Sequence, residues 1–250
     1  MSETNDTDIV TAAILVIGDE ILSGRTKDAN IGYIADHCTQ IGIQLKEVRI
    51  VPDEEDEIVG AVNALRGRYS YVFTTGGIGP THDDITADCI AKAFGVSIDV
   101  DQRALDLLIP AYKARGVELT PARLRMARIP DGADLVDNPI STAPGFMLDN
   151  VITMAGIPSV MQVMLDSVTP RLKKGCVMHS EAIDLDHPEG TVAGLLGAHQ
   201  EAYPDVSMGS YPTMKNNRPC TQLVLRSIDA DLLAKATSEL KNQLQAQSLI

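Results

Sequence analysis

Carboxylates and glycines are concentrated in three short stretches of this chain, and these residue types suit phosphate and metal chemistry. The stretches are GDEILSGRTKDAN (18–30), VPDEED (51–56) and TTGGIGPTHDD (74–84). In the third, Gly76, Gly77 and Gly79 admit positive φ and leave backbone N–H groups uncovered, so an anion can approach closely. Asp83 and Asp84 would repel a bare phosphate, but they can hold a divalent cation such as Mg²⁺ beside it.

The third stretch also has a simpler interpretation. Its glycines would form a tight turn, and one aspartate would cap the next helix. One cap needs only one carboxylate, so the pair favours a site in which Asp83 and Asp84 bind a metal and act in catalysis. Thr75 and the glycines would contact the phosphates. A lone histidine in a polar loop, such as His82, is more often a hydrogen-bonding side chain than a catalyst.

The first two stretches offer further candidates. Gly18 ends a buried run, and Asp19 and Glu20 follow it directly. These carboxylates either stabilise a short turn or accept hydrogen bonds from a heterocycle or ribose. Asn30 and Lys27 could each either form a local cap or contact a ligand. Asp53 follows Pro52 and is most simply a helix N-cap, although its position beside the other loops also makes it a catalytic candidate.

Two later stretches could bind an anion. In NPISTAPGF (138–146), Ser141 can donate to a phosphate, and Pro144 and Gly145 fix an extended loop; a rigid turn before a strand is an equal alternative. In GIPSVM (156–161), Ser159 lies at an expected helix start, where N–H groups are free.

The elements that must position these residues alternate between strand and helix. Apolar runs predict strands, and helical spacing or caps predict helices. The expected strands are 11–18, 44–51 and 69–77, and the expected helices include 28–42, 84–95, 101–116, 120–130 and 157–172. A further helix follows Pro52, and a hairpin turns at Asp149 and Asn150. This alternation predicts an α/β fold with a mostly parallel sheet between helices, so the three loops converge beyond the carboxyl ends of its strands.

The pattern breaks at the KKG stretch near Lys174. We therefore expect one α/β domain over 9–174 and a small α+β domain over 175–250. The second domain reads strand, helix, strand, strand and helix, and its two adjacent strands suggest antiparallel pairing.

Composition narrows the function classes. The 250-residue chain is 44% hydrophobic and has a formal net charge of −13, which argues against a nucleic-acid-wrapping protein. The opening MSETNDTD is polar with no apolar signal region after it, and no apolar run is long enough to span a bilayer. Four scattered cysteines, with no CxxC pair, indicate reduced thiols and a cytoplasmic protein.

Taken together, GDEILSGRTKDAN, TTGGIGPTHDDIT, STAPGF and GIPSVM, in that order, resemble the molybdopterin-binding domain family. The resemblance spans about residues 10–174 and is to the branch at the N-terminus of competence/damage-inducible protein A, the CinA type. The small second unit is similar to the KH-like second domain of that branch. No amidase domain follows here, so deamidase activity is not expected.

The resemblance implies a three-layer α/β/α fold and a pocket for a phosphorylated pterin or a nucleotide. In the molybdenum-cofactor branch, aspartates corresponding to Asp84 and Asp53 support adenylyl transfer with Mg²⁺. The CinA branch is associated with hydrolysis of ADP-ribose-type pyrophosphates by Mg²⁺, Mn²⁺ or Co²⁺. The segment RLRMARIP lacks the Ser-Arg usual in the adenylyltransferases. Two functions follow: a metal-dependent pyrophosphatase, or a non-catalytic molybdopterin-binding module. A homo-oligomer is the family-level expectation, and nucleic acid and membrane partners are not expected, since no GxxG clamp with basic flanks is evident.

Overall fold

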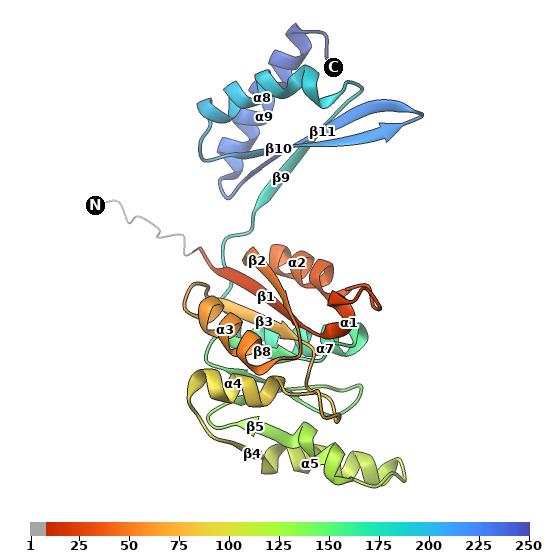
Figure 1. The fold of residues 1–250 in the computed structure, drawn as a ribbon. Helices are drawn as coiled ribbons and strands as arrows, with labels where there is room; N and C mark the ends of the chain where they lie inside the picture. The colour runs from red at the N-terminus through yellow and green to blue at the C-terminus, as the bar shows by residue number, and fades with distance from the viewer. Residues whose placement is uncertain (1–8) are drawn as a thin grey trace, which may run out of the picture. The chain divides into compact units, whose positions relative to one another are not determined.

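A computed structural model describes residues 9–250, and the polar opening stretch lies outside this range. The chain divides into two compact units, Met1–Gly175 and Cys176–Ile250. Figure 1 shows the elements of each unit. No helix of the described residues is long and apolar enough to cross a membrane.

The larger unit is built on a six-stranded sheet with the order β2-β1-β3-β8-β7-β6. Its strands are β1 (Thr11–Ile17), β2 (Gln44–Val51), β3 (Tyr71–Thr75), β6 (Asp134–Val136), β7 (Gly145–Leu148) and β8 (Val151–Met154). The β2, β1, β3 and β8 strands run parallel, β7 pairs antiparallel with β8, and β6 pairs antiparallel with β7. The predicted hairpin is confirmed: it joins β7 to β8 and turns at Asp149, whose φ is 51°.

Helices cover both faces of this sheet (Figure 1). The helices of the larger unit are α1 (Asp19–Leu22), α2 (Asn30–Gln40), α3 (Glu55–Arg66), α4 (Thr86–Phe94), α5 (Gln102–Ala114), α6 (Pro121–Leu124) and α7 (Pro158–Val168). Of these, α3 and α4 pack on one face of the sheet and α2 and α7 on the other. The predicted α/β fold with a mostly parallel sheet is confirmed.

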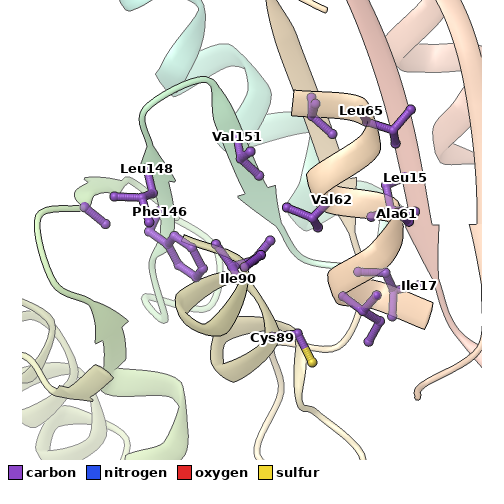
Figure 2. Packing of buried hydrophobic residues seen from close by; sticks show 14 of the residues in the cluster. Leu15, Ile17, Ala61, Val62, Leu65, Cys89, Ile90, Phe146, Leu148 and Val151 are labelled. Carbon is purple, nitrogen blue, oxygen red and sulfur yellow. The ribbon is translucent and has the colours of Figure 1, made fainter. Parts of the chain in front are cut away.

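Alternation along β1 explains the three layers. Leu15 and Ile17 belong to one buried cluster with residues of α3 and α4, whereas Ile14 and Val16 belong to another with residues of α2 and α7. Figure 2 shows the first cluster, with Leu15 and Ile17 on the side of α3 and Ile90 of α4 beside Phe146. A strand buried on both faces must be apolar at every position, as the TAAILVI sequence is.

The helix expected over 120–130 is wrong for most of its length. Thr120 does cap α6, accepting a hydrogen bond from the Arg123 N–H at 3.4 Å. The helix ends after one turn and continues as a 3₁₀ turn, η1 (Arg125–Ala127), and then as strand β5 (Arg128–Pro130). This strand pairs with β4 (Ile98–Val100) and buries Ile129. Because β4 lies far away in the sequence, the local residue spacing could not reveal this pairing.

The smaller unit has the order β9 (His179–Leu185), α8 (Glu189–Ala202), β10 (Ser207–Lys215), β11 (Arg218–Ser227) and α9 (Ala230–Ala246). Its antiparallel sheet has the order β10-β11-β9. The unit has its own apolar core, which includes Leu223 and Leu225 of β11 and Leu233 and Leu240 of α9. It is therefore a small α+β unit of the expected kind.

All four cysteines are free thiols, and three of them are buried. Burial raises the pKa of Cys38 and that of Cys89 to about 12 each. Cys176 is more accessible than the other three.

Candidate functional site

The glycine-rich loop after β3 is held in a conformation that only glycine fits. Gly76 has φ 102° and Gly77 has φ 65°. A Cβ on Gly76 would lie 2.1 Å from the Ile17 carbonyl oxygen, and one on Gly77 would lie 2.1 Å from the Thr86 hydroxyl. Glycine is thus needed at both positions for close packing and for positive φ.

The loop is tied to the start of α4 by Thr86. Its hydroxyl donates to the Gly76 carbonyl at 3.0 Å, and its N–H donates to the Gly77 carbonyl at 3.0 Å. Thr86 is fully buried. The glycine loop is therefore fixed to α4 by a threonine that sequence reasoning did not single out.

The predicted aspartate cap of α4 is wrong. The helix begins at Thr86 with no side-chain cap. Asp84 instead accepts from the Thr81 N–H at 2.7 Å and also from the Thr81 hydroxyl, which closes the loop on itself. The Asp83 side chain is exposed, as is that of His82, and their nearest charged atoms are 3.8 Å apart.

The loops after β1 and β2 are joined by Asp53. Its carboxylate accepts a hydrogen bond from the Asp19 N–H at 3.0 Å. Gly18 adds a backbone bond, donating to the Val51 carbonyl at 3.2 Å. The simplest prediction for Asp53, a cap of α3, is wrong: the cap position is Glu54, and no side chain caps that helix.

Carboxylates from the three loops act on Asp53. The pKa of Asp53 is raised, chiefly by partial burial, and the charges of Asp19, Glu20 and Asp83 raise it further. The hydrogen bond from the Asp19 N–H works in the opposite direction. A cation near these carboxylates would stabilise the charged form of Asp53.

Asn30 links a further loop to the same edge of the sheet. It is 4% exposed, and its Nδ2 donates to the Gly156 carbonyl at 2.8 Å. A Cβ on Gly156 would lie 3.3 Å from the Gly76 Cα, so Gly156 packs directly against the glycine loop. The Oδ1 of Asn30 is buried without a partner, as is the hydroxyl of Thr75.

Asn30 is not the helix cap that its position suggested. Asp28 satisfies the free N–H groups at the start of α2, because its Oδ1 accepts from Asn30, at 3.1 Å, and from Ile31, at 2.8 Å. The Lys27 and Ser159 side chains are both exposed, and Ser159 lies in the first turn of α7.

The 138–146 stretch divides between two places. Ser141 is held by Asn138, whose Nδ2 donates to the Ser141 hydroxyl at 2.5 Å and to the Ala143 carbonyl at 2.8 Å. This supports the rigid-turn interpretation for Ser141. Pro144 is buried and faces the glycine loop, whereas Gly145 lies in β7, where a Cβ would lie 2.3 Å from the Thr153 carbonyl oxygen.

A small niche lies where the glycine loop, α4, η1 and the start of β7 meet. It encloses about 20 Å³, room for little more than one water molecule. Its lining includes Gly77, Gly79, Asp84, Asp88, Arg125, Arg128 and Pro144. The two arginines come from the 120–130 segment, where sequence reasoning expected one continuous helix and named no site residue.

Within residues 9–250, no group of three or more His, Cys, Asp or Glu side chains is arranged to hold a metal ion. The Asp53 environment still favours a cation, and Mg²⁺ often takes only one or two carboxylates together with the phosphates of its ligand. The residues therefore fit a cation shared with a phosphorylated ligand better than a cation held by protein alone.

Comparison with known proteins identifies the family of the larger unit. Residues 13–174, well over half of the chain, match the family model described as a probable molybdopterin binding domain. The chain belongs to this molybdopterin-binding domain family. Residues 177–250 match a second model, the middle domain of FAD synthase.

Relatives support the CinA-type assignment. A CinA-like protein of Citrifermentans bemidjiense is 34% identical over 248 residues, covering 94% of this chain and 58% of the relative. Proteins of Caldivirga maquilingensis and Pyrobaculum arsenaticum are 38% and 36% identical, and the chain covers 65% and 79% of their lengths. The chain thus spans less than two thirds of the Citrifermentans and Caldivirga proteins.

A solved structure described as CinA with unknown function, from Thermoplasma acidophilum, has a similar fold. It is 34% identical with a TM-score of 0.61, and the match covers 65% of this chain and 98% of that one. The predicted resemblance to the CinA-type molybdopterin-binding family is confirmed.

Proposed function

We propose that this CinA-type chain binds a phosphorylated nucleotide or pterin at the edge of its sheet and hydrolyses a nucleotide pyrophosphate such as ADP-ribose with a divalent metal. One observation carries the proposal. The glycine loop, whose positive φ angles suit an anion, lies beside Asp53, whose pKa is raised chiefly by burial and further by the neighbouring carboxylates, which suits a cation.

A metal-bound diphosphate would satisfy both halves of this arrangement. A divalent cation would offset the charge of the phosphates and supply Lewis-acid activation of the phosphorus and of water. Asp83 and Asp84 are the metal ligands that we propose from the sequence. Of the two, Asp83 is the more exposed, and one oxygen of Asp84 is already engaged by Thr81. Asp53 is the third carboxylate that we propose to take part.

The chain's own groups have separate roles in this proposal. Gly76, Gly77 and Gly79 allow the phosphates to approach the backbone. Asp53 positions the start of α1 by accepting from Asp19, and its negative charge can orient an attacking water. Asn30 supports the loop from below through Gly156.

The substrate class is any nucleotide joined to a second group by a pyrophosphate. ADP-ribose is our first choice, and the match of residues 177–250 to the FAD synthase middle domain adds FAD as a second compound to test.

The test is release of AMP from ADP-ribose or FAD by the full chain in Mg²⁺, Mn²⁺ or Co²⁺, followed by chromatography. We expect turnover that EDTA abolishes. Absence of AMP with all three metals and both substrates would remove the hydrolase proposal.

Substitution of single carboxylates tests the role of each one in the reaction. We expect Asp83→Asn and Asp53→Asn each to lower kcat by about 10²-fold or more, in the range of losing one electrostatic or acid–base group. Asp149→Asn is the matched control, because it lies at the hairpin turn with a φ of 51° that Asn also adopts. Full activity in Asp83→Asn would refute its metal role.

The family match itself favours a second function, a molybdopterin-binding module without turnover. This alternative predicts saturable binding of purified molybdopterin in EDTA, with no metal-dependent product. A titration that detects no binding would reject it.

A further inference from the structure

Arg125 carries a positive charge that no carboxylate neutralises among the ion pairs of residues 9–250. Those pairs use Arg49, Arg68, Arg103 and Arg128. Arg125 makes a different contact: its Nη2 donates to the backbone carbonyl of Asp84 at 3.1 Å. Its Nε is shielded from solvent and has no hydrogen-bond partner.

A guanidinium offers five N–H donors in a planar fork. Among the described residues, the Nη2 of Arg125 has a protein acceptor, whereas its buried Nε has none. A buried donor without an acceptor is rare in folded proteins and calls for a missing partner. Oxygen atoms of a phosphoryl group match this fork in both geometry and charge.

The carboxylates that share the niche with Arg125 are already engaged. Asp88 pairs with Arg128, with its two oxygens 2.7 and 2.8 Å from the two terminal nitrogens. Asp84 accepts two hydrogen bonds from Thr81. Of the two arginines that line the niche, Arg128 is thus paired with a carboxylate and Arg125 is not.

The location of this charge points to the ligand. Arg125 lines the same niche as Gly77 and Gly79, and it holds the glycine loop through the Asp84 carbonyl. A niche with room for about one water can admit one oxygen of a phosphoryl group, which would meet backbone N–H groups on one side and the guanidinium on the other.

We propose that Arg125 is the anion-binding side chain of this site, receiving one phosphoryl group of the ligand beside Gly77 and Gly79. This inference rests on the proposed function only in taking a diphosphate as the ligand. Binding of an anion can be measured without turnover, so the two proposals can fail separately.

The experiment measures binding of inorganic pyrophosphate and of ADP-ribose to the full chain by calorimetry, first in EDTA and then with Mg²⁺ present. We expect Arg125→Gln to weaken both at least 10-fold and Arg125→Lys to weaken them less. Arg123→Gln is the matched control: it lies two residues earlier, and its guanidinium contacts the Glu118 carbonyl and the Tyr112 ring instead. Its affinity should equal that of the unmodified chain.

A measurement on the unmodified protein guards against a misfolded variant. In a ¹⁵N spectrum, addition of pyrophosphate should shift the Arg125 Nε–H signal and leave that of Arg123 in place. Wild-type affinity in Arg125→Gln, no binding of either anion by the unmodified chain, or an unmoved Arg125 signal would each overturn the inference. If Arg125→Gln loses anion binding and the unmodified chain releases no AMP, the role of Arg125 in anion binding is supported and the hydrolase proposal is rejected.

Discussion

At the scale of single residues, Asp53 combines two effects that oppose each other. It is a structural acceptor for the Asp19 N–H, yet burial and three neighbouring carboxylates raise its pKa. Groups with perturbed pKa values are concentrated at ligand-binding and catalytic sites.

The sign of this effect can be tested. A carboxyl group whose pKa is higher in the folded than in the unfolded state binds more protons when folded, so stability falls as pH rises through that window. We therefore expect Asp53→Asn to raise the unfolding temperature of the larger unit by about 1–3 °C at pH 7, and less at pH 4. The Asn oxygen can still accept from Asp19. Scanning calorimetry at both pH values checks this, and a lower midpoint at pH 7 would contradict it.

Glycine substitutions separate backbone strain from crowding. Gly24, Gly76 and Gly77 all have positive φ, but only Gly24 has no atom near the place a Cβ would occupy. We expect Gly24→Ala to cost about 1–2 kcal/mol from φ alone. Gly76→Ala and Gly77→Ala should cost about 2–5 kcal/mol, since overpacking is added.

Urea denaturation of the three variants measures these differences. An equal loss for Gly24→Ala and Gly76→Ala would show that the Ile17 carbonyl yields easily and that close packing does not fix the loop.

At the scale of elements, the 138–144 turn depends on one side chain. Asn138 is 6% exposed and makes four hydrogen bonds, donating to Ser141 and Ala143 and accepting from the N–H groups of Ile140 and Ser141. Removing it would leave three backbone groups of the turn and the Ser141 hydroxyl without this partner.

We expect Asn138→Ala to destabilise the larger unit by about 2–4 kcal/mol, the cost of several unsatisfied groups. Ser141→Ala removes one of these bonds and should cost about 1 kcal/mol. Denaturant titration compares the two, and a larger effect from Ser141→Ala would mean that the hydroxyl has another role.

Elements of the parallel sheet could be predicted from sequence because each carries its own local signal. The apolar run of β1 and the stop at Gly95, with φ 69°, need no distant partner to be recognised. By contrast, β5 depends on pairing with β4, about thirty residues earlier, so a helix was expected in its place. Long-range pairing overrides local propensity here.

The candidate site, like the fold, could be predicted only where local sequence signals were sufficient. The glycine loop and the carboxylates of Asp19 and Asp53 could be placed at one edge because parallel strands end together. The specific contacts could not: Asp53 bonding to Asp19, and Arg125 facing the glycine loop, arise only once the segments are folded together.

At the scale of the whole molecule, charge argues against nucleic acid. A net charge of −13 gives no electrostatic attraction to a phosphate backbone. The smaller unit does contain Gly194 and Gly197 at GxxG spacing, but both lie inside α8 and not in a loop that could clamp a backbone.

We therefore expect no binding of a single-stranded RNA 20-mer to the full chain at 150 mM salt, with a Kd weaker than about 10⁻⁴ M. Fluorescence anisotropy measures this. Saturable binding below that concentration would show that the smaller unit recognises RNA despite its acidity.

The buried cysteine of α4 can report on the binding of a compound to the glycine loop. With a pKa of about 12, Cys89 is almost wholly un-ionised at pH 8, so a thiol reagent can label it only when α4 opens. The same helix begins at Thr86, which is bonded to the glycine loop. Any compound that occupies the loop should therefore slow the labelling of Cys89, while the more accessible Cys176 supplies the reference rate in the same tube. A chemical library can thus be ranked by protection alone, before the reaction itself is known.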